Sequence, residues 1–334
     1  MSSVTIKDVA KLAGVSLSTA SYVLNNKGAV SEKTRDKVLL AARKLNYKPN
    51  AIARSLVTGS SKTIGLLIPD ISDPYFTEIV KGVEECANSN GYSVILCNTD
   101  RKLEKENQYF NILKEKRADG IILTGGAMNN DRHLLRLEDD NIAVVVIGRH
   151  SLPFRAVVVD NVMAAREVTE YLLGKGHRRI GFISGSLLST TSQDRLEGYK
   201  QALAFHGVPY DESLVSEADF KVQGGMEAAR RFFELPMERR PTAVFAGNDQ
   251  MAIGVMGAAR EYGLRVPEDI AVVGFDDIPL ASLVTPSLTT VRLPMYEMGY
   301  KAMELLLESI AGDKETHSNR VVFCGYEFVM RDSA

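Results

Sequence analysis

From Thr63 onward the sequence alternates short apolar runs with longer amphipathic segments, and this alternation constrains the fold more than any other feature. The apolar runs are IGLLIP, YSVILC, GIILTG, AVVVIG, RIGFIS, TAVFAG and IAVVGF. The segments between them have helical spacing, over residues 76–89, 104–116, 163–174, 193–206, 223–234, 249–262 and 294–311. Strands that alternate with helices pair in parallel, so the sequence predicts a doubly wound α/β fold with parallel sheets.

Two stretches of this region resemble each other. They are KTIGLLIPDISDPYFTEIVKGVEECANSNGYSVI and RRIGFISGSLLSTTSQDRLEGYKQALAFHGVPYD. Each contains a strand, a long loop and a helix with a glycine near its middle, Gly82 in one and Gly198 in the other. The repeat predicts two similar lobes that meet at the ends of their strands, with a cleft between them.

Ligands of open α/β sheets bind outside the carboxyl ends of the strands. Aromatic faces and planar polar side chains in such a cleft suit a polyhydroxylated ring, because the aromatics cover its apolar face and the polar groups pair with its hydroxyls. Each residue also has a structural alternative, such as capping a helix. The candidate ligand-binding residues are Asp73, Tyr75, Phe76, Arg149, Ser189, Thr191, Arg195, Phe220, Asn248 and Asp276.

The charge of the chain is divided unevenly. Residues 1–60 contain ten lysines and arginines and three acidic residues, a net charge of +7, although the whole chain carries −2. The remaining residues therefore carry −9. A basic N-terminal part on an acidic body indicates a polyanionic partner for the N-terminal part alone.

Three short helices are predicted in residues 1–49. Thr5 and Asp8 form a capping-box pattern before the first helix, and Gly14 permits a tight turn after it. Ser16 is placed to cap a second helix with sequence LSTASYVLN, and Ser31 to cap a third. Two helices joined by a glycine turn are typical of a helix-turn-helix, although any small three-helix domain remains an alternative.

The outward face of the second helix favours DNA binding. Its small polar side chains and Leu17 permit close approach to base edges, because the major groove admits one helix. The lysines and the N-terminus of this helix can bind phosphates. Together with the charge of +7, this turn favours a DNA-binding domain over other three-helix domains.

Residues 50–57, NAIARSLV, have a helix-like composition but span only about two turns. An isolated helix needs roughly 12–15 residues in water, so this segment is not expected to be stable alone. It presents Leu56 and Val57 and then runs into the linker GSS. This combination indicates a helix that folds only against a partner.

The segment VTIKDVAKLAGVSLSTASYVLN resembles the LacI/GalR family of bacterial transcription regulators. The resemblance continues through VSEKTRDKVLLAARKLNYKPNAIARSL and SKTIGLLIPDISDPYF and covers essentially the whole chain. It implies that Leu17, Ser18 and Tyr22 read bases, whereas Thr19 and Ser21 contact the DNA backbone. The family usually has Arg at the position of Tyr22, and Arg is the strongest reader of guanine, so the base opposite Tyr22 is not determined.

The resemblance also identifies residues 50–57 as a hinge helix. Asn50 would cap it, Ala53 would permit close approach to the minor groove, Arg54 would lie near phosphate, and Leu56 would insert between base steps. The full set of candidate DNA-binding residues is Thr5, Ser16, Leu17, Ser18, Thr19, Ser21, Tyr22, Asn25, Asn50, Ala53, Arg54 and Leu56.

For the body, the resemblance implies a two-lobed, periplasmic-binding-protein-like effector domain of type I. The implied division is a helix-turn-helix domain over residues 1–49, a hinge over 50–61 and an effector domain over 62–334. Lobe one is expected at about 62–160 and 291–320, and lobe two at about 161–290 and 321–334. In the family, positions matching Phe76, Arg149, Arg195, Asn248 and Asp276 commonly line the effector cleft.

These features predict a repressor controlled by a small effector, which is a sugar, a sugar acid or a sugar phosphate. A homodimer would bind a roughly palindromic double-stranded operator. No C-terminal leucine heptad follows YEFVMRDSA, so a dimer is expected rather than a tetramer. Two alternatives stay open, namely a phosphorylated carrier protein as corepressor and a purine as effector.

Signatures of catalysis are missing from the sequence. It has no GxxxxGK[ST], HExxH or GxGxxG motif after a strand, and its five histidines lack metal-ligand spacing. We therefore expect no enzyme activity, no cofactor and no metal. Cys86, Cys97 and Cys324 form no CxxC pair, and neither a signal peptide nor a membrane span is recognisable. The expected location is the bacterial cytoplasm, associated with the nucleoid.

Overall fold

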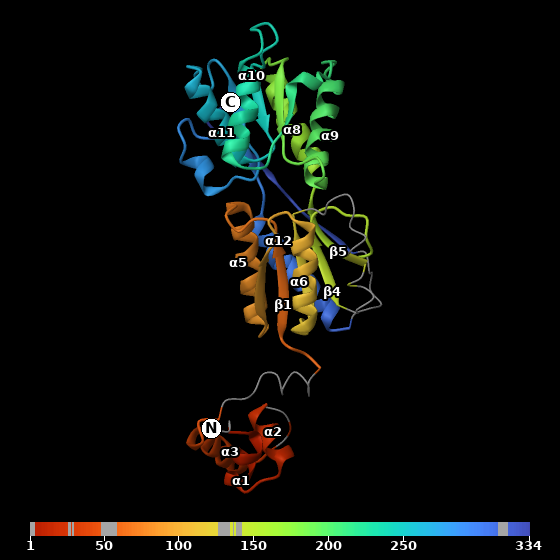
Figure 1. Ribbon diagram of the computed structural model, residues 1–334, viewed down its shortest axis with the longest axis vertical. Helices are drawn as coiled ribbons and strands as arrows, with labels where there is room; N and C mark the ends of the chain where they lie inside the picture. The colour runs from red at the N-terminus through yellow and green to blue at the C-terminus, as the bar shows by residue number, and fades with distance from the viewer. Residues whose placement is uncertain are drawn as a thin grey trace. The chain divides into compact units, whose positions relative to one another are not determined.

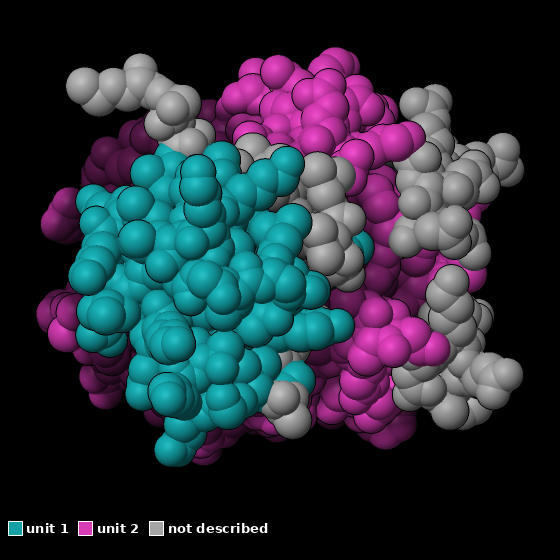
Figure 2. All heavy atoms as spheres, turned by 90° about the horizontal axis from the view of Figure 1, so that it is seen from below, with its two compact units in different colours: residues 1–61 teal, residues 62–334 magenta. Residues whose placement is uncertain are grey.

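The structure is a computed structural model that describes residues 4–25, 28, 30–47, 59–125, 134, 135, 137, 142–312 and 320–334. It divides into two units, Met1–Ser61 and Lys62–Ala334, which are coloured separately in Figure 2. The predicted hinge residues Asn50, Ala53, Arg54 and Leu56 lie outside the described residues.

The described residues of the first unit form three helices, α1 (Ile6–Ala13), α2 (Leu17–Leu24) and α3 (Glu32–Lys44), as predicted (Figure 1). Their shared core consists of Val9, Ala10, Ala20, Val23, Val38, Ala41 and Ala42. The many alanines let these short helices pack closely. The predicted capping box is present, because the Asp8 carboxylate accepts hydrogen bonds from the backbone nitrogen (2.9 Å) and the hydroxyl (2.7 Å) of Thr5. Gly14 ends α1 with a φ of +66°.

Lobe one of the second unit is built on a six-stranded parallel sheet of order β11-β5-β4-β3-β1-β2. Its strands are β1 (Thr63–Ile68), β2 (Ser93–Asn98), β3 (Gly120–Thr124), β4 (Ala143–Ile147), β5 (Arg155–Val159) and β11 (Val321–Cys324). Its helices include α5 (Pro74–Ser89), α6 (Leu103–Glu115) and α12 (Met295–Ile310). Cys86, Cys97 and Cys324 are buried and free.

Lobe two has a four-stranded parallel sheet of order β7-β6-β8-β9. Its strands are β6 (Ile180–Ser184), β7 (Val215–Glu217), β8 (Ala243–Ala246) and β9 (Ala271–Val273). Its elements also include α8 (Asn161–Gly174), α9 (Thr190–Phe205), α10 (Val222–Phe233), α11 (Asp249–Glu261) and the 3₁₀ turns η2 (Glu212–Leu214) and η3 (Pro279–Ser282). Figure 1 shows α8 to α11 in a body distinct from that of α5, α6 and α12.

The repeated mid-helix glycine has the same packing role in both lobes. A Cβ on Gly82 of α5 would lie 2.0 Å from the Tyr296 carbonyl oxygen of α12. A Cβ on Gly198 of α9 would lie 2.2 Å from the Val162 carbonyl oxygen of α8. Each glycine therefore lets a pair of helices approach until their backbones touch.

Along the residues that the structure describes, the chain crosses between the lobes three times. Besides the passage from β5 to α8, two strands cross as an antiparallel pair, β10 (Thr290–Arg292) and β12 (Glu327–Val329). The parallel α/β prediction is confirmed, but the predicted end of lobe one at residue 320 is wrong. β11 pairs in parallel with β5, so lobe one extends to Cys324. The predicted apolar runs also did not include β5, β7, β10, β11 or β12, of which β7, β10 and β12 have only three residues.

No helix among the described residues is both long and apolar enough to cross a membrane.

Candidate functional site

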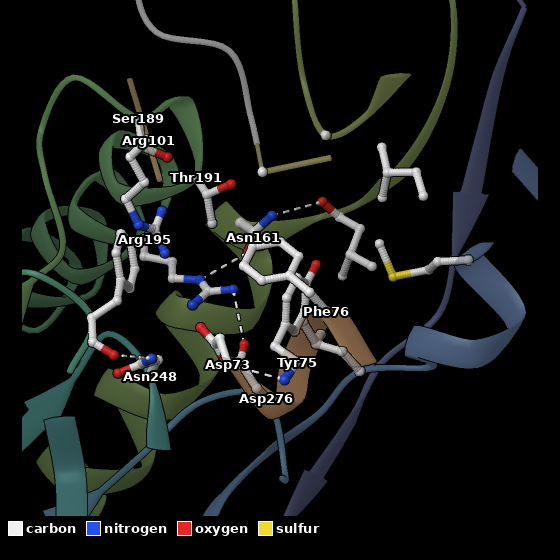
Figure 3. Close-up of a pocket in the computed structure, with 17 residues that line it drawn as sticks. Asp73, Tyr75, Phe76, Arg101, Asn161, Ser189, Thr191, Arg195, Asn248 and Asp276 are labelled. Carbon is white, nitrogen blue, oxygen red and sulfur yellow. Dashed lines mark hydrogen bonds and ion pairs between the residues drawn. The ribbon is translucent and has the colours of Figure 1, made fainter. Parts of the chain in front are cut away.

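A cavity lies between the two lobes, at the carboxyl ends of their strands (Figure 3). Its volume is about 60 Å³, counted as the space open to the centres of water-sized molecules. That space corresponds to a ligand envelope of roughly 200 Å³, since the ligand surface extends one water radius further. A single sugar ring or one nucleobase is of this size.

The cavity brings together nine of the ten residues that the sequence predicted as ligand contacts. They are Asp73, Tyr75, Phe76, Ser189, Thr191, Arg195, Phe220, Asn248 and Asp276. Arg101 and Asn161 line it as well. Arg101 was not predicted, although it follows the strand YSVILC, and the strand-end rule used for the other residues could have identified it.

Arg149 was predicted to line the cleft and does not line the cavity. Its guanidinium instead forms a forked ion pair with Asp194 of α9, with Nε–Oδ2 at 2.9 Å and Nη2–Oδ1 at 2.7 Å. The Thr190 hydroxyl also donates to the Arg149 carbonyl oxygen at 3.0 Å. The arginine after β4 therefore joins the two lobes beside the cavity.

Arg195 of α9 lies at the centre of the cavity, and its guanidinium is held by three hydrogen bonds and one aromatic ring. Its Nε donates to Asn161 Oδ1 at 2.9 Å, and its Nη1 donates to the Gly247 carbonyl oxygen. Its Nη2 donates to Asp276 Oδ1 at 3.3 Å. The guanidinium carbon also lies 3.7 Å from the centroid of the Phe275 ring. A buried arginine held in this way is pre-organised to orient a ligand.

Asp276 combines burial with an unusual backbone conformation. Its φ is +112°, and its backbone is held by hydrogen bonds to and from the crossing strand β10 and the residue after it. Burial raises the pKa of the Asp276 carboxyl well above its usual value, and the Arg195 guanidinium opposes this rise. Non-glycine residues with positive φ concentrate at functional sites, which supports a binding role for this aspartate.

Two further polar residues cap helices at the cavity wall. Asn248 accepts a hydrogen bond from the Met251 backbone nitrogen at 2.9 Å and donates to the Phe220 carbonyl oxygen at 3.0 Å. Asp73 accepts from the Tyr75 backbone nitrogen at 3.1 Å, and burial raises the pKa of its carboxyl. Tyr75 and Phe76 meet edge to face, with centroids 4.9 Å apart. The cavity thus has charged groups at its centre and aromatic rings at its wall.

Asp249 lies behind the cavity at the start of α11. It is fully buried and accepts hydrogen bonds from the Thr290 hydroxyl at 2.5 Å and the Ile278 backbone nitrogen at 2.8 Å. Burial raises the pKa of this carboxyl to about 7. Because Thr290 belongs to β10, Asp249 links lobe two to a crossing strand.

In the first unit, α2 presents its predicted outward side chains to solvent. Leu17 is 45% exposed and Tyr22 is 53% exposed, and Ser18 is exposed as well. A Cβ on Gly28 would lie 3.7 Å from the Tyr22 ring, so the ring packs beside the following turn. Ala20 and Val23 are buried on the opposite face.

The other candidate DNA contacts of this unit lie at helix ends or on the same face. Thr5 precedes α1, and the Ser16 hydroxyl accepts from the Thr19 backbone nitrogen at 3.1 Å as the cap of α2. Asn25 ends α2 and donates to the Ser21 carbonyl oxygen at 2.9 Å. Thr19 and Ser21 are partly buried.

A helix-turn-helix unit followed by a two-lobed domain with a ligand-sized cavity defines a DNA-binding regulatory protein. Residues 5–50 match the family described as bacterial regulatory proteins, lacI family. Residues 169–334 match a periplasmic binding protein-like domain. The chain belongs to the lacI family of bacterial regulatory proteins, as the sequence predicted.

Curated relatives align over nearly the full length of the chain. The HTH-type transcriptional repressor PurR of Photobacterium profundum is 38% identical over 98% of this chain and 98% of its own. The ribose operon repressor of Halalkalibacterium halodurans is 42% identical over 92% of this chain and 90% of its own. The lac repressor dimer bound to operator and the anti-inducer ONPF has a TM-score of 0.88 and 29% identity, covering 99% of each chain. The relatives are transcriptional regulators.

Proposed function

We propose that this protein is a transcriptional repressor whose affinity for operator DNA is set by a monosaccharide or a close sugar derivative bound between its lobes. The observation that carries this proposal is the buried pair of Arg195 and Asp276 at the centre of a cavity the size of one sugar ring. Planar charged groups form paired hydrogen bonds to adjacent hydroxyls, and the rings of Tyr75 and Phe76 can cover an apolar sugar face.

The ribose operon repressor, which is 42% identical over 92% of this chain, is named for a sugar, and this supports a sugar effector. A phosphorylated carrier protein is less well supported. It would need a basic surface on lobe one, yet on α5 and α12 the exposed Glu84, Glu85, Glu297 and Glu304 outnumber Lys81 and Lys301. Acidic side chains repel a phosphate group, so the cavity is the better candidate for the regulatory site.

For DNA, we propose that α2 enters the major groove and that its exposed Leu17, Ser18 and Tyr22 contact base edges. Leu17 suits a thymine methyl group, because apolar side chains contact that group in the major groove. The hinge segment would insert Leu56 into the minor groove when two copies bind together. The lac repressor dimer bound to operator supports a homodimer and a roughly palindromic site.

Several contacts would couple the cavity to the hinge by holding the lobes together. Besides Arg149 and Asp194, the Lys221 ammonium of lobe two lies 3.5 Å from an Asp70 carboxylate oxygen of lobe one. A ligand that contacts both lobes stabilises this closed arrangement relative to an open one. A difference of only about 1–3 kcal/mol changes operator affinity 5- to 150-fold.

A screen followed by a binding assay tests this function. Thermal unfolding of the full chain is measured with sugars, sugar acids, sugar phosphates and nucleobases, and the stabilising ligand is then added to a titration of operator DNA selected from a random pool. We expect a sugar or sugar derivative to raise the unfolding temperature and change operator affinity at least 5-fold. Stabilisation by nucleobases alone, or chemical turnover of a sugar, would refute the proposal.

Light scattering tests the oligomeric state. We expect a dimer at micromolar concentration, and a stable monomer or tetramer would contradict it.

A further inference from the structure

Arg101 reaches the cavity from lobe one (Figure 3). Its guanidinium meets the ring of Phe220 from lobe two. The guanidinium carbon lies 4.8 Å from the centroid of the Phe220 ring. Both residues have positive φ, +58° for Arg101 and +66° for Phe220. Both residues are bulky, they come from different lobes, and they are in contact at the cavity. Because positive φ is unfavourable for bulky residues, this conformation indicates a role in binding.

The Phe220 ring is covered on its other side by Gly185. A Cβ on Gly185 would lie between 2.0 and 2.4 Å from three neighbouring ring carbons. Nearly equal distances to three ring carbons place this glycine over the face of the ring rather than beside its edge. Gly185 does not line the cavity, whereas Arg101 does. The Gly185 backbone therefore covers one face of the ring, and the Arg101 guanidinium occupies space beside the ring that a planar base would need for stacking.

The two cavity arginines differ in the use of their donors. Arg195 uses three of its five N–H groups on Asn161, Gly247 and Asp276. Within the part of the chain that the structure describes, Arg101 has neither a hydrogen-bond acceptor nor an ion-pair partner. Its planar fork of N–H groups is therefore available to a ligand. The carboxylates of Asp73, Asp70 and Asp219 lie near enough to balance its charge, so the ligand does not need to be an anion.

We propose that Arg101 is a specificity residue that selects a non-planar, hydroxylated ring over a planar nucleobase. Its N–H groups donate to two adjacent ligand oxygens, and its guanidinium shields Phe220 from stacking. This inference rests on the proposed function, because it assigns the choice between ligand classes at the same cavity. Removing the guanidinium takes away the donors and exposes the aromatic face at once.

Isothermal titration calorimetry of the full chain tests this inference. The ligands are ribose, arabinose, xylose, glucose and galactose on one side and hypoxanthine, guanine and adenine on the other. The variants are Arg101→Ala and Arg101→Asn, of which the second suits the left-handed backbone because asparagine tolerates positive φ. The matched control is Lys102→Ala, which removes a positive charge from the exposed neighbouring residue. Thermal unfolding verifies that each variant is folded.

We expect the wild type to bind at least one sugar and no nucleobase. Both Arg101 variants should lose at least 10-fold in sugar affinity, Arg101→Ala should gain measurable affinity for a nucleobase, and Lys102→Ala should match the wild type. If the Arg101 variants keep sugar affinity within 3-fold of the wild type, the role of Arg101 is refuted while the proposed function stands. If the wild type binds nucleobases and no sugar, both are refuted.

Discussion

The contact between α8 and α9 makes Gly198 a position where a single methyl group should have a measurable effect. In Gly198→Ala, the new Cβ would lie 2.2 Å from the Val162 carbonyl oxygen and 2.8 Å from the Arg166 backbone nitrogen. Carbon–oxygen contacts lie at about 3.3–3.6 Å, so the two helices must separate by about 1 Å. Both clashing atoms belong to the backbone, so no side-chain rotation relieves the overlap.

The magnitude follows from two opposing effects. Alanine is favoured over glycine within a helix by roughly 0.5–1 kcal/mol. Overpacking costs typically about 1–3 kcal/mol and more when backbone must move. We expect a net loss of about 2 kcal/mol in the free energy of unfolding, which lowers the Tm of the body by about 4–8 °C.

Differential scanning calorimetry of the full chain measures this loss against Gly174→Ala. Gly174 ends α8, and a Cβ there would meet nothing within 4 Å. Because Gly174 is the last helical residue, the control gains at most this helix preference and adds no clash, so its Tm should equal or slightly exceed that of the wild type. If Gly198→Ala is as stable as Gly174→Ala, the explanation of the repeated glycine by backbone contact is incorrect.

Four further predictions concern the cavity and the DNA-binding surface. Asp276→Asn removes the charge that pairs with Arg195 and should reduce sugar affinity roughly 10- to 100-fold, since hydrogen bonds to charged groups contribute about 1.5–3 kcal/mol. Calorimetry measures this loss, and operator affinity without ligand should not change. In Asp249→Asn, a carboxyl is lost whose pKa is 3.8 unfolded and about 7 when folded. The folded wild type binds the proton of this carboxyl more tightly than the unfolded chain does, so its free energy of unfolding falls as the pH rises from about 4 to 7. Asparagine does not titrate, so between pH 5 and pH 8 the variant should gain about 3 kcal/mol in free energy of unfolding relative to the wild type. Urea unfolding at both pH values measures this gain, and a pH-independent difference would contradict it. Tyr22→Arg should shift base preference toward guanine opposite this residue by about 1–3 kcal/mol in titrations of operator variants, and an unchanged preference would show that Tyr22 does not face a base. Leu56→Ala should weaken operator binding while sugar binding is retained, and equal operator affinity would exclude the proposed wedge.

Several parts of this protein could be predicted from local sequence because their causes are local. The capping box of Thr5 and Asp8, the glycine turn at Gly14 and the alternation of strands and helices each depend on neighbouring residues. The strand-end rule placed eight candidate residues at one cavity, because parallel strands bring their carboxyl ends to the same edge, whereas Phe220 follows β7, which the sequence did not predict. These features needed no knowledge of which elements pack together.

The pairing of distant side chains could not be predicted in this way. Arg149 and Arg195 each follow a predicted strand at the cleft. In the structure, however, Arg149 pairs with Asp194, whereas Arg195 pairs with Asp276. Which carboxylate each arginine meets depends on the relative position of the two lobes. The same is true of Arg101, whose role depends on Phe220 of the other lobe.

By itself, the sequence determined the helix-turn-helix, the parallel α/β lobes and the set of strand ends where a ligand can bind, because periodicity, capping and turn residues act over a few positions. The tertiary structure alone decided that β11 belongs to lobe one, that Arg149 joins the lobes instead of lining the cavity, and that Arg101 covers Phe220. These outcomes depend on contacts between residues far apart in the chain, and such contacts exist only after the lobes have packed.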